Sequence, residues 1–104
     1  MNSSELKNLR RIAHHLHPVV MVGDGGVSDA VIAETERALD DHELIKVKVN
    51  AMDRDDRAEM IAALAGACQA ETVQKIGKIA VLYRRNPEAK PALSNLSADL
   101  KRDR

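Results

Sequence analysis

The sequence predicts an α/β domain, a two-layer sandwich in which a mixed β-sheet of about four strands packs with three helices in the order α-β-α-β-α-β-β. Segments with apolar residues at helical spacing alternate with short segments rich in valine and isoleucine, which is typical of strands packed with helices. Three glycines stand between the first strand segment and the second helix. Only two residues separate the last two strand segments, so these strands must pair as a tight antiparallel hairpin.

Length and composition are those of one soluble domain. The chain has 104 residues, of which 44% are apolar and 31% are charged. No segment reaches the length of a membrane span, and the N-terminus lacks the basic and apolar pattern of a signal peptide, so we expect a cytoplasmic protein with no membrane partner. Cys68 is the single cysteine, which excludes an internal disulfide and a cysteine-built zinc site. We expect it to be a small buried apolar residue.

A first helix is expected to begin at Ser3 or Ser4, either of which can cap it, and to end at His17, because the following Pro18 disfavours helical backbone there. Its apolar residues fall on one face. The opposite face carries Lys7, Arg10, Arg11 and His14. The three histidines of this segment do not share a face at helical spacing, so we predict no metal site.

The stretch from Pro18 to Asp29 joins a strand, a glycine turn and the start of a second helix, which Ser28 caps and which runs to about His42. Glycines let another molecule approach the main chain closely, and the first N–H groups of a helix lack internal partners, so such a turn is chemically suited to a phosphate oxygen. The candidate residues in it are Gly23, Asp24, Gly25 and Gly26. The carboxylate of Asp24 would repel a phosphate unless it turns away or accepts a hydrogen bond within the turn.

Residues 44–50 alternate between apolar and polar side chains, so the side chains of Lys46 and Lys48 point to the same face of a strand. A strand with this pattern has one face less buried than the other, which indicates that part of the sheet is open or near an edge. Asp53 then caps a third helix, which runs to about Cys68.

Two strands, 71–76 and 79–84, follow around the turn Gly77-Lys78. The basic residues of this hairpin and its end are Lys75, Lys78, Arg84 and Arg85. After Asn86, prolines, serines and mixed charges replace periodicity. We therefore expect a domain over residues 1–86 and a flexible tail over residues 87–104.

The formal net charge is zero, with 16 basic and 16 acidic residues, but the charges are unevenly placed. Residues 28–59 have a local balance of −5 and residues 60–104 one of +4, so the protein can still present a basic face to a polyanion. Tyr83 is the only aromatic residue. A multi-residue platform for stacking splayed bases is thereby nearly excluded.

With these residues placed, the chain resembles the CRM domain, the chloroplast RNA splicing and ribosome maturation domain, in its free-standing bacterial YhbY-like form. The resemblance runs from about Leu6 to Arg84. It rests on Leu16-His17-Pro18-Val19-Val20, on Gly23-Asp24-Gly25-Gly26 as the family's G-x-x-G loop, on His42-Glu43-Leu44-Ile45-Lys46-Val47-Lys48, on Ile76-Gly77-Lys78 and on Val81-Leu82-Tyr83-Arg84.

The resemblance implies an RNA-binding domain similar in fold to the C-terminal domain of bacterial translation initiation factor three. It also implies an association with ribosomal precursor RNA, in pre-ribosomal particles of the large subunit. We expect contact mainly with backbone phosphates, by a monomer without a cofactor. The expected RNA-binding residues are Gly23, Asp24, Gly25 and Gly26 in the loop and Lys7, Arg10, Arg11, Lys46, Lys48, Lys75, Lys78, Arg84 and Arg85 around it.

Two other functions fit parts of the sequence. A nucleotide-binding enzyme is disfavoured because Ser28 stands where the last glycine of G-x-G-x-x-G belongs and no G-K-[S/T] follows, so we predict no catalytic residues and no enzyme. The stronger alternative is a protein-interaction module that docks on a ribosomal or other basic protein. Neutral net charge, scarce aromatic residues and an acidic second helix suit that alternative.

Overall fold

The structure is a computed structural model that describes residues 1–96. Caps and turns divide this part of the chain into seven elements. In order they are α1 (Ser3–Ala13), β1 (Pro18–Val22), α2 (Asp29–His42), β2 (Leu44–Val49), α3 (Arg54–Cys68), β3 (Glu71–Ile76) and β4 (Ile79–Tyr83). The predicted fold class is confirmed, with three helices and one four-stranded mixed sheet. Within residues 1–96, no helix has the length and apolar character needed to cross a membrane.

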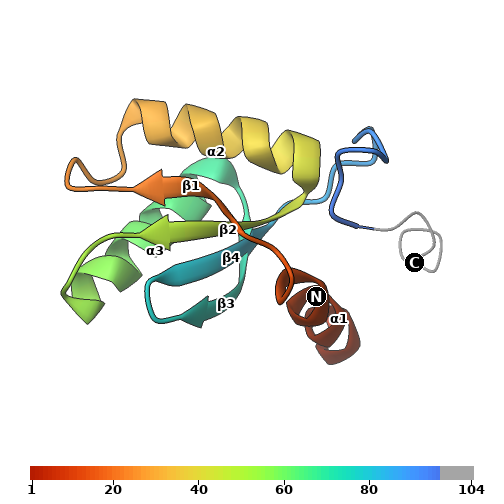
Figure 1. Ribbon diagram of the computed structural model, residues 1–104, viewed down its shortest axis with the longest axis horizontal. Coiled ribbons are helices and arrows are strands. Elements are labelled where there is room, and N and C mark those ends of the chain that lie inside the picture. Colours follow the sequence, from red (N-terminus) through yellow and green to blue (C-terminus); the bar gives the residue numbers. More distant parts are fainter. Residues whose placement is uncertain (97–104) are drawn as a thin grey trace.

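The strands lie in the order β1-β2-β4-β3. β1 and β2 are parallel, with α2 as the crossover between them, whereas β4 pairs antiparallel with β2 on one side and with β3 on the other. In Figure 1, α2 and α3 cover one face of the sheet and α1 lies against the other face near one end. The sheet therefore has a covered face and a second face that α1 covers only in part.

Strand alternation divides the core in two. The larger cluster lies between the sheet and helices α2 and α3, and includes Val47, Leu39 and Leu64. The smaller cluster lies between the sheet and α1, and includes Leu9 and Val81. Both clusters use apolar side chains that alternate along the strands, so each central strand contributes to both faces.

The predicted caps are correct for two helices: Ser28 and Asp53 each accept hydrogen bonds from backbone N–H groups of the first turn. α1 differs, because Asn2 caps it, its Oδ1 accepting from the N–H of Glu5 at 2.8 Å. This helix also ends at Ala13, before His17, because the N–H groups of His15 and Leu16 donate three residues back, to the carbonyls of Ile12 and Ala13, and close turns that are no longer α-helical.

The segment after β4 folds back onto the domain. The sequence predicts a flexible tail from Pro87, but residues 87–96 contact the start of β2. The N–H of Asn95 donates to the carbonyl of His42 at 3.0 Å, its Nδ2 donates to the carbonyl of Leu44 at 2.6 Å, and Leu96 is 3% exposed in the α1 cluster. A single anchoring leucine leaves no periodic signal in the sequence. The rest of the predicted tail, residues 97–104, lies outside the described residues.

Candidate nucleic-acid interface

The glycine loop, Gly23–Gly26, lies at the surface, with Gly23, Asp24 and Gly25 exposed and Gly26 half-buried. The N–H of Gly26 donates to the carbonyl of Gly23 at 3.0 Å, which closes a turn, and Gly26 has a φ of +70° that favours glycine. A Cβ atom added at Gly23, Gly25 or Gly26 would meet nothing within 4 Å. A ligand could therefore approach the backbone of this loop closely.

The loop leads into the positive end of α2, where Asp29 and Ala30 are exposed in the first turn. The hydroxyl of Ser28 accepts from the N–H of Val31 at 3.2 Å, which satisfies one donor of this turn. Two carboxylates, those of Asp24 and Asp29, oppose an approaching anion at the same place. The loop can offer main-chain N–H groups, but it is not a net positive site.

The hairpin turn brings one basic residue, Lys78, to the same end of the sheet as the glycine loop. β1 and β2 end side by side, with the N–H of Asn50 donating to the carbonyl of Val22 at 2.8 Å. The N–H of Val49 donates to the carbonyl of Lys78 at 2.7 Å, so the hairpin turn lies at the same end of the sheet. Lys78 is therefore close to this end, and its Nζ lies 3.7 Å from the sulfur of Met52. Figure 1 shows the three connections grouped at one end.

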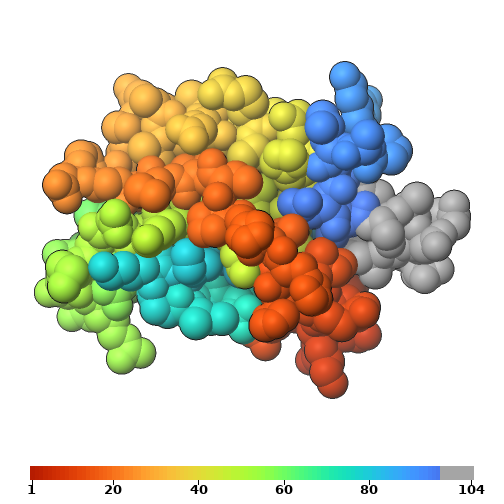
Figure 2. Space-filling model, in the orientation of Figure 1, coloured from red at the N-terminus to blue at the C-terminus, as the bar shows by residue number. Residues whose placement is uncertain are grey.

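Lys46 and Lys48 point away from α2 and α3. Cross-strand partners share a face, and the register pairs Lys48 with Met21 of β1 and with Ile79 of β4, which is in turn paired with Ile76 of β3. We call the surface formed by Met21, Lys46, Lys48, Ile76 and Ile79 the open face. Met21 is 57% exposed and Ile76 is 60% exposed, so no helix within residues 1–96 covers these two side chains. Figure 2 shows atoms of β1, β2 and the hairpin side by side at the surface.

α1 borders the open face at the opposite end from the glycine loop. It packs on the same side of the sheet, because Leu9 lies in the smaller core cluster. Lys7, Arg10 and Arg11 are exposed on its outer side. Arg10 is held beside β3, its Nε donating to the carbonyl of Val73 at 3.3 Å. One side of the sheet thus combines cations from α1 and β2, and Lys78 lies in the hairpin turn at its end.

Arg84, in contrast, lies on the side of the sheet that α2 and α3 cover. Its guanidinium forms ion pairs with Glu36 at 2.9 Å and Asp40 at 2.8 Å, and donates to the carbonyl of Cys68 at 2.8 Å. Although burial acts to lower the pKa of Arg84, the hydrogen bond and charge of Glu36 and the carboxylate of Asp40 raise it above its ordinary value. Arg84 therefore joins α2 to the end of β4 and is not part of the predicted basic patch.

Two other predicted residues lie away from the open face and the loop. Lys75 is paired with Ala80, which is buried under the helices, so its side chain points to the covered side. Arg85 is exposed beyond the end of β4, at the end of the sheet far from the glycine loop, since Tyr83 pairs with Leu44 at the start of β2. The predicted gathering of all the cations around the loop therefore does not occur.

Sequence reasoning missed Arg54 and Arg57. They line a cavity of about 410 Å³ between α3 and the hairpin, together with Ala58, Ile61, Lys75 and Gly77. The spacing i, i+3, i+4, i+7 on α3 is the signal that places the first four of these on one stripe. Lys75 comes from the hairpin, and it lies opposite these residues only in the folded protein.

The fold and the open face define a small α/β domain with basic side chains on a partly uncovered sheet. The chain belongs to the CRS1/YhbY (CRM) domain family, whose family model matches residues 1–84, so the resemblance predicted from the motifs is confirmed.

Curated relatives and a solved structure agree with this assignment. A Pseudomonas aeruginosa protein named as a probable RNA-binding protein is 44% identical over 97 residues, covering 93% of each chain. A Haemophilus influenzae protein named as an RNA-binding protein is 47% identical over 90 residues, covering 86% of this chain and 91% of the relative. A hypothetical protein of Staphylococcus aureus, known from its solution structure, is similar with a TM-score of 0.75 and 34% identity, covering 86% of this chain and 94% of that one.

Proposed function

We propose that the protein binds RNA mainly through the phosphate backbone, along the open face from α1 to the glycine loop. One observation carries the proposal: Lys46 and Lys48 stand on the sheet face that α1 covers only in part, between the basic side of α1 and the loop. β2 has six residues and is therefore about 20 Å long at roughly 3.3 Å per residue, enough for several consecutive phosphates. The names of the relatives as RNA-binding proteins support the same function.

Base recognition plays a small part in this proposal. Tyr83, the only aromatic residue, packs against the α1 cluster. The exposed apolar residues Met21 and Ile76 can contact sugars and base edges without reading sequence. Selectivity then depends on RNA shape and on the spacing of phosphates.

We further propose that the target is structured ribosomal precursor RNA, bound during assembly of the large ribosomal subunit. On this proposal the protein acts in the cytoplasm as a monomer and performs no catalysis. The loop contributes the main-chain donor of Gly25, and the cations supply an attraction that salt screens.

The test is the salt dependence of RNA binding. With about four phosphates neutralised, log K against log salt has a slope near −3, taking roughly 0.7 per contact on single strands. The double variant Lys46→Gln and Lys48→Gln is expected to weaken binding and to flatten that slope by about 1.4. Arg37→Gln, an exposed charge on α2, serves as the control and is expected to change neither. Salt-independent binding, or equal effects of both variants, would contradict the proposal.

Docking on a ribosomal or other basic protein is the alternative, and the exposed carboxylates of Asp29 and Glu34 on α2 favour it. Ultraviolet crosslinking in cell lysate separates the two functions. RNA crosslinks at β2 support the proposal, whereas protein adducts without RNA would replace it by the alternative.

A further inference from the structure

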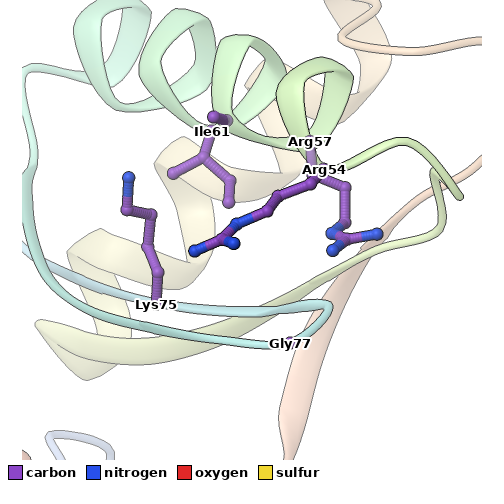
Figure 3. A pocket seen from close by; sticks show the side chains of 6 residues that line it. Arg54, Arg57, Ile61, Lys75 and Gly77 are labelled. Atoms are coloured by element: carbon purple, nitrogen blue, oxygen red, sulfur yellow. The ribbon is translucent and has the colours of Figure 1, made fainter.

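A cavity of about 410 Å³ lies on the covered side of the sheet, between the N-terminal half of α3 and the β3–β4 hairpin. Figure 3 shows the side chains of Arg54 and Arg57 extending from α3, and that of Lys75 from β3, toward the space between these elements. Ala58 and Gly77 leave room because they are small, and Ile61, which is 4% exposed, forms an apolar floor. We call this space the α3 groove.

The cations of the α3 groove form no ion pairs within residues 1–96. Ion pairs among residues 1–96 involve Arg84 with Glu36 and Asp40, and none involves a cation of the groove. The acidic residues Asp55, Asp56 and Glu59 lie on other faces of α3, because they are not at the i, i+3, i+4, i+7 positions that line the groove. The groove is therefore a local concentration of positive charge on a protein with zero net charge.

Backbone carbonyls hold the guanidinium of Arg57 in place. Its Nη1 donates to the carbonyls of Ala51 and Met52, at 2.8 and 2.9 Å, in the connection between β2 and α3. A guanidinium has five N–H donors in a planar fork, so these two bonds orient the fork and leave other donors for a ligand. A pre-oriented arginine binds a phosphate with less loss of side-chain entropy.

We propose that the α3 groove binds a phosphodiester of the same RNA, as a second contact on the opposite side of the sheet from the open face. This inference rests on the proposed function. Lys75 and Ile76 are consecutive on β3 and point to opposite faces of this edge strand. An RNA strand that leaves the open face at Ile76 and passes around the hairpin thus reaches Lys75, the neighbouring residue of β3. Lys78 lies in the hairpin turn that follows Ile76.

Phosphodiester fits the groove better than an acidic peptide does. A peptide segment needs apolar anchors at its interface, and the groove offers the small surfaces of Ala58 and Ile61 beside three cations. Arginine forks match phosphate oxygens in bidentate geometry, and lysine adds a point charge. Continuity with the open face around the hairpin also favours one polyanion that contacts both surfaces.

The test uses the double variant Arg54→Gln and Lys75→Gln, because both side chains are exposed and their loss leaves Arg57 and its carbonyl contacts in place. The matched control, Arg37→Gln with Lys90→Gln, removes the same charge from exposed positions on α2 and after β4. The probe is a labelled RNA stem-loop with single-stranded flanks, measured by fluorescence anisotropy. The groove variant is expected to bind about tenfold more weakly and to flatten the salt slope by about 1.4, whereas the control keeps the slope.

The outcomes separate this inference from the proposed function. If the groove variant matches its control while Lys46→Gln with Lys48→Gln weakens binding, the inference fails and the proposed function stands. If neither variant weakens binding, both fail. Amide chemical shifts of Ala58 and Gly77 supply a second readout: they are expected to move on titration with the RNA, and movement with polyglutamate alone would assign the groove to an acidic protein partner and overturn the inference.

Discussion

Glu36 of α2 accepts a hydrogen bond from the guanidinium of Arg84 at 2.9 Å, which joins the middle of a surface helix to the end of the central strand β4. The side chain of Arg84 is only 20% exposed, and it also donates to backbone carbonyls of α2 and α3. One arginine therefore holds three elements together on the covered side of the sheet.

Arg84→Gln is expected to lower the free energy of unfolding by about 2 kcal/mol, because it removes charge-assisted hydrogen bonds and leaves Glu36 without this partner. RNA affinity of the folded variant is expected to stay unchanged, since this guanidinium faces away from the open face. Urea denaturation and anisotropy measure the two effects. Arg85→Gln is the control, with unchanged stability. A stable Arg84→Gln variant with weakened RNA binding would show that Arg84 is part of the RNA interface.

Because of Cys68, the free energy of unfolding is expected to decrease at alkaline pH. Burial, followed by the hydrogen bond and charge of Glu36, raises the pKa of this thiol to about 11 from 9.0. Because the unfolded chain loses the proton first, this contribution is intact below pH 9 and is lost as pH rises toward 11. At pH 10 the loss is about 1 kcal/mol, at roughly 1.4 kcal/mol per pKa unit.

The measurement is urea denaturation of the natural protein and of Cys68→Ala at pH 8 and pH 10. The difference in stability between the two proteins is expected to shrink at the higher pH. A difference that stays constant between these pH values would show that the thiol does not titrate in this window.

The glycine loop offers a matched pair of substitutions. Gly26→Ala is expected to cost about 1 kcal/mol of stability, because Gly26 has a φ of +70°. Gly25→Ala meets no atom within 4 Å and is expected to leave stability unchanged. If RNA approaches the main chain at this loop, Gly25→Ala still weakens RNA binding, since the added methyl group occupies the approach. Thermal melting and anisotropy together test this, and unchanged binding would remove the loop from the interface.

Asp24 opposes the proposed contact, because its exposed carboxylate lies within the loop. Asp24→Asn is expected to raise RNA affinity a few-fold at low salt, and the gain is expected to shrink as salt screens the charge. Glu34→Gln, on the outer side of α2, is the control for a general change in net charge. Equal gains from both variants would mean that Asp24 is not near a bound phosphate.

Leu96 tests whether the segment after β4 belongs to the folded domain. This side chain is 3% exposed in the α1 cluster, so Leu96→Ala is expected to lower the free energy of unfolding by about 2–4 kcal/mol. Leu93→Ala, at a residue that is 42% exposed, is the control and is expected to cost much less. Chemical denaturation measures both. A negligible cost at Leu96 would place the domain boundary at Asn86, as the composition predicts.

Patterns within single elements predicted most of the fold and part of the candidate interface. Ser28 and Asp53 cap their helices through bonds to residues two or three positions ahead, so a short window of sequence contains the cause. Lys46 and Lys48 share a face because strands alternate with period two, which requires no knowledge of the rest of the chain. The turn at Gly77 follows in the same way from the two residues available to reverse the strand.

Local patterns in the chain are therefore enough to predict the order of the elements, the caps of α2 and α3, and the alternation that puts two lysines on one strand face. Three relationships depend on how the elements pack: the bonds of Arg84 to Glu36 and Asp40, the position of Lys75 opposite Arg54 and Arg57, and the entry of Leu96 into the core. These relationships join residues distant in the chain. Alternation along a strand separates its side chains into two sets but does not decide which set lies under the helices. That depends on the face of the sheet on which α2 and α3 pack.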